Sequence, residues 1–170
     1  MLDLNAAILG VEPRLRQLIG KNVRLVARLG PGTGHIRVDA GQLDQLMVNL
    51  VVNARDAMPD GGTVTIATGL IRIDEPGAIE PVVVTPGLYV RLVVWDTGIG
   101  MDQETREHIF EPFFTMKAIG KGAGLGLATS YEIVQGAGGH IWVYSEPGVG
   151  SSFTLLFPFV DVVKALAPGP

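Results

Sequence analysis

The segment of residues 39–58 constrains the fold more than any other part of the sequence. Its apolar residues recur at helical spacing and fall on one face: Leu43, Leu46, Met47, Leu50, Ala54, Ala57 and Met58. Such a face must be buried against a second layer. The residues that follow, Pro59-Asp-Gly-Gly62, end the helix. Segments that alternate apolar and polar residues, as half-buried strands do, can form that layer; they are residues 23–29, 35–38, 63–73, 89–95, 140–145 and 152–157.

Further helices are predicted for residues 4–19, 103–109 and 124–135, from apolar spacing and flanking glycines. Helices and strands in this order predict an α+β fold, a two-layer α/β sandwich. Its sheet is expected to be mixed and largely antiparallel, with helices covering one face. We expect one domain over residues 1–160, with residues 161–170 as a linker, because Pro168-Gly-Pro170 cannot continue a regular element. Since a helix starts almost at Met1, we expect either a piece of a longer parent protein or a very compact natural start.

The composition excludes several classes of protein. Lys and Arg number 13 against 17 Asp and Glu, a net charge of −4, and no basic cluster stands out. Nucleic acid and anionic membranes are therefore not expected as partners. Absence of cysteine excludes a disulfide scaffold and thiolate metal sites. Without a signal peptide or an apolar run near 20 residues, the fragment is expected to be cytoplasmic and free of membrane contact, whether or not its parent is anchored.

A polar stripe borders the apolar face of the helix at 39–58. It consists of Gln45, Asn49, Asn53 and Asp56. Asn53 is nearest the apolar edge, so its amide can face a bound ligand. A neutral carbonyl oxygen suits Mg²⁺ where a triphosphate supplies most of the negative charge. The same spacing also fits a solvated amphipathic helix, and spacing alone leaves both interpretations open.

A carboxylate follows the strand at 89–95. Asp96 is followed by Thr97-Gly98-Ile99-Gly100, whose glycines allow a tight turn and a close approach of backbone to a ligand. The carboxylate can accept a hydrogen from the exocyclic amine of adenine and would repel the oxygen of guanine. A charge-assisted bond of this kind contributes roughly 1.5–3 kcal/mol, enough to select the base. A β-turn with Asp in its first position fits the same residues.

The segment of residues 110–124, called the lid below, combines aromatic residues with glycines. Phe110, Phe113 and Phe114 flank Pro112, and glycines then occupy alternate positions at 120, 122, 124 and 126. Gly124-Leu-Gly126-Leu127 opens a helix, whose free amides favour phosphate, and Lys117 and Lys121 add positive charge. The alternative is a flexible surface loop, against which the exposed aromatic cluster argues.

In this order, the motifs resemble those of the catalytic, ATP-binding domain of sensor histidine kinases. That family shares the Bergerat fold with gyrase, heat-shock chaperone and mismatch-repair ATPases, and the resemblance covers residues 4–158. The matching motifs are Asn49-x-x-x-Asn53-Ala-x-Asp-Ala57, Asp96-Thr-Gly-Ile-Gly100, Phe110-Glu-Pro-Phe-Phe114, Gly122-Ala-Gly-Leu-Gly126 and Gly148-Val-Gly-Ser-Ser-Phe153.

The resemblance implies a role for each matched position. Asn53 corresponds to the Mg²⁺ ligand, Asn49 to its companion in catalysis, Asp96 to the adenine-binding aspartate and Lys117 to a phosphate-facing lysine. Ser151 stands beside the adenine pocket, where threonine is more usual. Met116 and Ala123 replace common threonines. The implied nucleotide site comprises Asn53, Asp56, Ala57, Asp96, Gly98, Ile99, Gly100, Phe110, Lys117, Gly122, Ala123, Gly124, Leu125, Gly126, Leu127 and Ser151.

The resemblance implies a protein histidine kinase that takes the γ-phosphate from Mg-ATP. Its acceptor would be a histidine on a separate dimerisation domain, and a response regulator receiver domain would act downstream. His35, His108 and His140 do not lie in the helical hairpin of such an acceptor, so we expect structural or surface roles for them.

Three alternatives are weaker. Self-contained ATPases of the superfamily resemble Glu-x-x-x-Asn here, whereas Asn49 cannot act as a general base. A histidine acceptor needs no such base, because neutral imidazole is already nucleophilic. The intact glycines and Asp96 argue against a non-catalytic interaction module, and the phenylalanine motif argues against a serine-directed kinase of the anti-sigma type.

Overall fold

The computed structural model describes residues 1–76, 83–112, 114, 126–166 and 168–169. Along the chain the elements are β1 (Leu2–Asp3), α1 (Leu4–Ile19), β2 (Val23–Leu29), β3 (His35–Ile36), α2 (Ala40–Asp56), β4 (Gly62–Ile73), β5 (Gly87–Asp96), α3 (Gln103–His108), α4 (Gly126–Gly136), β6 (His140–Glu146), β7 (Gly150–Pro158) and α5 (Val162–Leu166).

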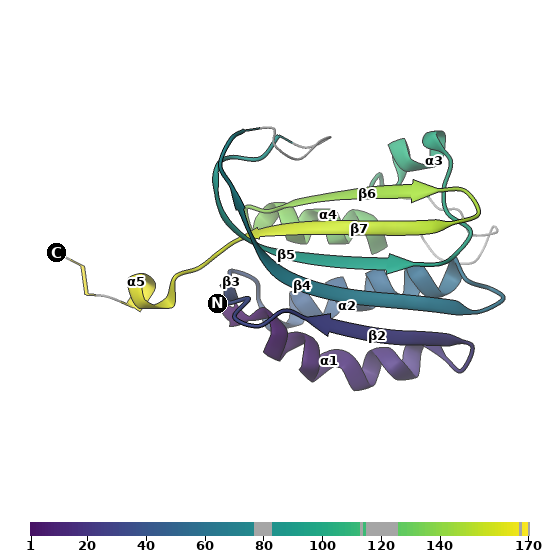
Figure 1. Cartoon of the computed structure of the whole chain (residues 1–170), viewed down its shortest axis with the longest axis horizontal. Helices are drawn as coiled ribbons and strands as arrows, with labels where there is room; N and C mark the ends of the chain where they lie inside the picture. The colour runs from purple at the N-terminus through teal and green to yellow at the C-terminus, as the bar shows by residue number, and fades with distance from the viewer. Residues whose placement is uncertain (77–82, 113, 115–125, 167, 170) are drawn as a thin grey trace.

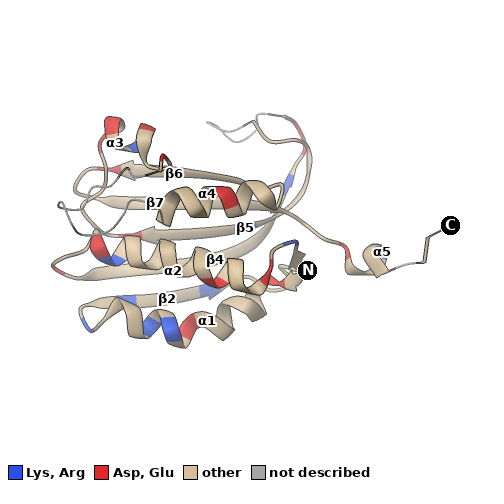
Figure 2. Ribbon diagram, turned by 180° about the vertical axis from the view of Figure 1, so that it is seen from behind, with Lys and Arg blue, Asp and Glu red and all other residues tan. Residues whose placement is uncertain are grey.

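The main sheet has the strand order β2-β4-β5-β7-β6. Strands β2 and β4 are parallel, and the other neighbours are antiparallel. Helices α1, α2 and α4 lie on one face of this sheet, whereas no helix in the described part of the chain covers the other face (Figures 1 and 2). The predicted two-layer sandwich, with its mixed and largely antiparallel sheet, is therefore confirmed.

Helix α2 is the centre of the helical layer, because it packs against both α1 and α4. Of its predicted apolar face, six residues are at most 4% exposed: Leu43, Leu46, Met47, Leu50, Ala54 and Met58. Ala57 is the exception, since it caps the helix and is only partly buried. Alternate side chains of β4, β5 and β7, such as Ile66, Leu92 and Leu155, belong to the same hydrophobic core.

Short elements are where the structure departs from the sequence predictions. Strand β3 ends at Ile36, two residues earlier than predicted, and pairs with the unpredicted β1. Asp39 is the N-cap of α2, but its side chain makes no capping hydrogen bond. Part of the expected linker is helical, because the Asp161 carboxylate accepts hydrogen bonds from the backbone N–H groups of Val163 and Lys164 and so starts α5. Helix α5 projects away from the sandwich (Figure 1).

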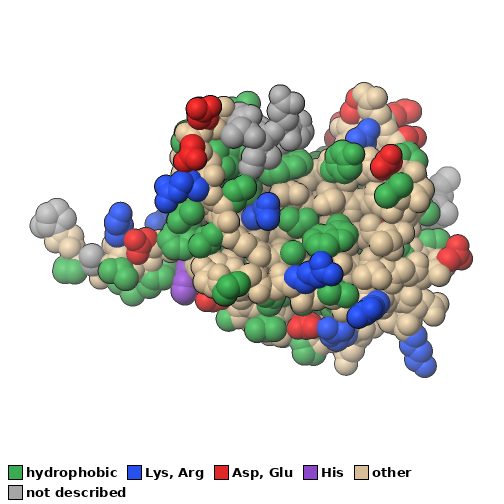
Figure 3. Space-filling model, viewed as in Figure 1, with side chains coloured by type: hydrophobic (Ala, Val, Ile, Leu, Met, Phe, Trp, Pro, Cys, Tyr) green, Lys and Arg blue, Asp and Glu red, His purple; other side chains and the backbone are tan. Residues whose placement is uncertain are grey.

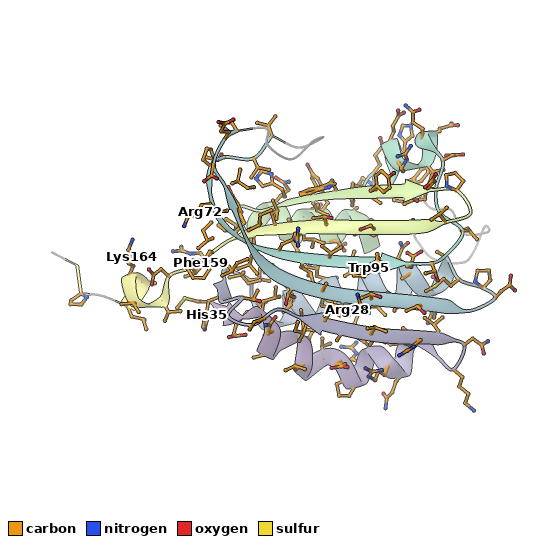
Figure 4. The ribbon with its side chains drawn as sticks, in the orientation of Figure 1. Arg28, His35, Arg72, Trp95, Phe159 and Lys164 are labelled. Atoms are coloured by element: carbon orange, nitrogen blue, oxygen red, sulfur yellow. The ribbon has the colours of Figure 1, made fainter. Side chains whose placement is uncertain are left out.

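The face of the sheet without helices is basic although the chain is acidic. Alternation along the strands places Arg24, Arg28 and Arg91 on this face, with Glu146 at its edge. Arg28 and Trp95 are labelled in Figure 4. Figure 3 shows basic side chains over the strands, with acidic side chains mainly at the margins. No helix among the residues described is long and apolar enough to cross a membrane.

The core on the helical face should dominate the stability of the domain. Leu155 is fully buried there, between β5 and β6. We expect Leu155→Ala to lower the free energy of unfolding by about 2–5 kcal/mol, because it removes buried methyl groups and leaves a cavity. Urea denaturation would measure it. Thr154→Ala, one position along on the opposite face, should cost much less; equal losses would contradict this assignment of faces.

Candidate functional site

The two motifs predicted to form one site lie in direct contact. At the end of α2 the Ala57 carbonyl accepts a hydrogen bond from the Ile99 N–H, 2.9 Å away. Gly98 lies so close to the Ala57 carbonyl that an added Cβ would collide with it. Thr97 fixes the same turn to β4, because its N–H donates to the Thr63 carbonyl at 3.2 Å. The turn after Asp96 is thus fastened to the helical layer and to the sheet.

Asp96 is the last residue of β5 and is 5% exposed. Its Oδ1 accepts a hydrogen bond of 2.9 Å from the Gly98 N–H. Ser151 lies opposite it on β7, and the Ser151 backbone also hydrogen-bonds to the carboxylate. Burial raises the pKa of Asp96 above its ordinary value and outweighs the two backbone hydrogen bonds, which lower it. A carboxylate held in this way benefits from a further donor, such as an amine.

The glycines are required by the protein's own backbone as well as by any ligand. Gly100 has φ +70°, and an added Cβ would collide with the Glu146 carbonyl. Gly150, with φ +143°, faces the Asp96 carbonyl just as closely. The sequence predicted close approach to a ligand at Gly98 and Gly100; the structure shows close approach to neighbouring strands and to α2.

Asn49 and Asn53 differ in their environments. The Asn49 Nδ2 donates to the carbonyl of Gly126 at 3.0 Å, so it links α2 to the first residue of α4. Asn53 is one turn further along and half-buried, and its amide makes no hydrogen bond with any residue that the structure describes. Asp56 is exposed and forms an ion pair with Arg55, with Oδ1 3.1 Å from Nη2. Unlike Asn49, the half-buried Asn53 therefore has no hydrogen-bond partner for its amide among the described residues.

Much of the lid lies outside the described residues, including Lys117, Gly122, Ala123, Gly124 and Leu125. At its start, the Phe110 ring is 5.7 Å from the ring of Tyr131 on α4 and 6.2 Å from that of Phe153 on β7. At its end, Leu127 is 8% exposed and its side chain belongs to the core. Phe110, before the undescribed residues, and Leu127, after them, are thus both held by apolar contacts.

The three histidines occupy the positions expected of them. His35 forms a bridge with Val160, and the His140 ring lies edge-on to that of Tyr89, 6.4 Å away. His108 is partly exposed at the end of α3, where its Nδ1 lies 2.8 Å from the Glu111 Oε1. This carboxylate raises the pKa of His108. Each of the three histidines thus contacts a neighbouring part of the fold, in line with the structural or surface roles expected of them.

A residue that sequence reasoning missed lies behind Ser151. Ser145 on β6 is 4% exposed, and its Oγ is 2.7 Å from the Ser151 Oγ. It also accepts a hydrogen bond of 2.8 Å from the Met101 N–H. A serine in a strand has no periodic signal of its own. Only the pairing of β6 with β7, which sets Ser145 opposite Ser151, reveals the contact.

Comparison with known proteins places these residues in a family context. Residues 38–161 match the family model described as "Histidine kinase-, DNA gyrase B-, and HSP90-like ATPase". Among curated proteins, sensor kinase CckA of Brucella abortus (strain 2308) is 40% identical over 158 residues. These make up 93% of this chain but 17% of that protein, so the chain spans a small part of its relative.

Solved structures agree in fold. The catalytic domain of histidine kinase ThkA superposes with a TM-score of 0.68 and 27% identity, over 92% of this chain and 93% of that one. Full-length ShkA in complex with AMPPNP gives a TM-score of 0.67 and 26% identity, over 95% of this chain and 31% of ShkA. Both superpositions include almost the whole sandwich.

The raised pKa of Asp96 predicts how adenine nucleotide binding depends on pH. Only the ionised carboxylate accepts an amine hydrogen without giving up a lone pair to a proton. Affinity should therefore fall as the pH drops through the raised pKa, and the loss should begin above the ordinary Asp value of 3.8. Titration calorimetry with AMPPNP at several pH values would measure it. Asp96→Asn should bind weakly with little pH dependence in this range; an identical pH profile in both proteins would contradict the role of Asp96.

Proposed function

The chain belongs to the family of histidine kinase-, DNA gyrase B- and HSP90-like ATPases, and we propose that it serves as the ATP-binding catalytic domain of a sensor histidine kinase. In this role it binds Mg-ATP and presents the γ-phosphate to a histidine on a separate dimerisation domain. Phosphoryl transfer of this kind depends on positioning and charge neutralisation more than on covalent catalysis by the protein.

The observation that carries the proposal is the buried Asp96 carboxylate at the junction of the two motifs. It lies between the Gly98 N–H and the strand position of Ser151, behind a turn that is fixed to α2. An acceptor so placed matches the exocyclic amine of adenine. Full-length ShkA, which shares the fold, was solved with AMPPNP, an adenine nucleotide analogue. We infer that this chain binds adenine at Asp96, with Ser151 beside it.

The residues present also fit a Mg²⁺ ion, with Asn53 as its protein ligand. The Asn53 amide is half-buried and unengaged by the described residues, as a ligand oxygen should be. The ion would supply positive charge that offsets the charge of the phosphates. We assign the phosphate contacts to Lys117, the glycines 122–126 and the N-terminal end of α4. Asp56, Ala57, Ile99 and Phe110 complete the proposed nucleotide site.

Asn49 distinguishes kinase from hydrolytic ATPase. Its amide is neutral and already donates to the Gly126 carbonyl, so it is suited to holding α4 and cannot take a proton from water. We propose that it positions the phosphate end of the site for transfer to a histidine. The self-contained ATPase is therefore the less supported function.

The partners proposed are domains of the parent kinase and of a response regulator. The relatives that match this chain are sensor kinases several times its length, of which it spans 17% in CckA. The acceptor histidine would lie on a dimerisation domain, and the phosphoryl group would pass to a receiver domain. We propose a cytoplasmic location, without contact to nucleic acid or membrane by this domain.

The direct test of the proposal combines binding and transfer. Calorimetry with AMPPNP, with and without Mg²⁺, should show Mg²⁺-dependent binding by the purified domain. Radiolabelled ATP should then label the parent's dimerisation domain, added in trans, and a variant of that domain lacking its histidine should stay unlabelled. Absence of binding at millimolar AMPPNP would overturn the proposal. Phosphate release without labelling of the acceptor would favour the ATPase.

Asn53→Ala should reduce binding chiefly in the presence of Mg²⁺. Loss of one ligand oxygen should weaken AMPPNP binding about tenfold with Mg²⁺, or about 1.4 kcal/mol, and change it little in EDTA. Gln45→Ala is a matched control, because Gln45 lies two turns upstream on the same helix and is exposed. Its affinity should equal that of the wild type. An equal loss with and without Mg²⁺ would remove Asn53 from the metal site.

A further inference from the structure

The Ser145 hydroxyl has more partners than it has hydrogens. Its Oγ lies 2.8 Å from the Met101 N, 3.0 Å from the Gly150 carbonyl and 2.7 Å from the Ser151 Oγ. The Met101 N–H is a donor and the Gly150 carbonyl an acceptor, whereas the Ser151 hydroxyl can be either. Since Ser145 has one hydrogen to donate, it can give it to Gly150 or to Ser151, but not to both.

These two arrangements leave the Ser151 hydroxyl in different states. If Ser145 donates to Gly150, Ser151 can donate to Ser145, and its hydrogen is then directed back into the protein. If Ser145 donates to Ser151, the hydrogen of Ser151 is available to a ligand. Because Ser145 accepts from Met101 in both cases, that backbone N–H remains satisfied. The direction of one buried hydrogen bond thus decides whether Ser151 offers a donor.

Ser145 also connects the two sides of the candidate adenine site. Met101 directly follows Gly100, so the bond to Ser145 fixes the exit of the turn that begins at Asp96. Ser151 lies opposite Asp96 in the pairing of β5 with β7. Ser145, Ser151 and Asp96 are all at most 6% exposed. Such a network is shielded from water, which would otherwise substitute for its members.

We propose that Ser145 is a positioning residue of the adenine site, which orients the Ser151 hydroxyl as a donor beside the Asp96 acceptor. This inference rests on the proposed function and deepens it. An acceptor next to a donor matches adenine, which presents an amine hydrogen beside the ring acceptor N1. Hypoxanthine presents the reverse pattern, an oxygen beside a ring N–H. Ser145, which need not touch the nucleotide, would therefore contribute to selection of ATP over ITP.

Replacement of Ser145 tests the proposal through base selectivity. Ser145→Ala should weaken ATP binding about tenfold and lower the ratio of ATP to ITP affinity about fivefold or more, because a buried hydrogen-bond network discriminates strongly between bases. Calorimetry with both nucleotides and Mg²⁺ would measure the two affinities. Ser145→Cys has nearly the same volume and only a weak donor, so it should change selectivity in the same direction even if the alanine variant is too unstable to measure.

A matched control separates positioning from general stability. Thr33 carries a buried hydroxyl that donates to the Gly30 carbonyl at 2.6 Å. It lies between β2 and β3, and β2 ends at the opposite end of the sheet from the end of β5, where Asp96 lies (Figure 1). Thr33→Val should lower the melting temperature without changing ATP or ITP affinity. Ser145→Thr, which retains a hydroxyl, should preserve selectivity better than Ser145→Ala.

A second measurement asks whether Ser145 acts through Ser151. Ser151→Ala should itself reduce selectivity, and adding Ser145→Ala to it should reduce selectivity little further, because the two hydroxyls act as one unit. Unchanged ATP-to-ITP ratios in Ser145→Ala and Ser145→Cys, together with normal wild-type binding, would overturn the inference and leave Ser145 a structural residue. Absence of ATP binding by the wild type would instead overturn the proposed function.

Discussion

The close contact between the end of α2 and the turn after β5 is the constraint on which the site depends. The Ala57 carbonyl receives the Ile99 N–H, and Gly98 must lack a side chain for the two backbones to approach. This contact depends on the burial of six of the seven residues of the apolar face of α2, which fixes the position of the helix on the sheet. Core packing therefore determines where Asn53 lies relative to Asp96.

The buried polar groups at the site depend on one another, or on neighbouring backbone groups, for their hydrogen bonds. Asp96 is stabilised by backbone N–H groups that the turn and β7 provide, yet burial still raises its pKa. Ser145 satisfies Met101 and contacts Ser151. Burying any one of these polar groups without a hydrogen-bond partner would cost free energy, and the hydrogen bonds among them offset most of that cost. Because burial raises the pKa of Asp96, its ionised form is less stable in the folded domain than in water, and a ligand that donates one more hydrogen bond to it would stabilise that form.

The sequence predicted the long elements and the meeting of the two motifs, because both depend on strong periodic patterns. The face of α2 and the strands β4 and β5 extend over several turns or alternations, so their boundaries were correct to within about two residues. Two-residue strands such as β1 carry no such pattern, and α5 begins at a single capping carboxylate. Ser145 was missed because its role arises from cross-strand pairing between β6 and β7. The roles of all the predicted site residues, from Asn53 and Asp96 to Lys117 and residues 122–125, remain predictions.

The two ends of the proposed nucleotide site differ in how the fold supports them. At the adenine end, Asp96, Gly98 and Ser151 belong to strands or turns held by backbone hydrogen bonds, so a ligand meets a surface that is already formed. At the phosphate end, the elements are linked by a side chain: Asn49 on α2 donates a hydrogen bond to the carbonyl of Gly126 at the start of α4. A backbone contact is independent of residue type, whereas this link disappears if Asn49 changes. Substitutions in α2 can therefore alter the position of α4 without altering the surroundings of Asp96. In the proposed function, affinity for the base and delivery of the phosphate could then vary separately.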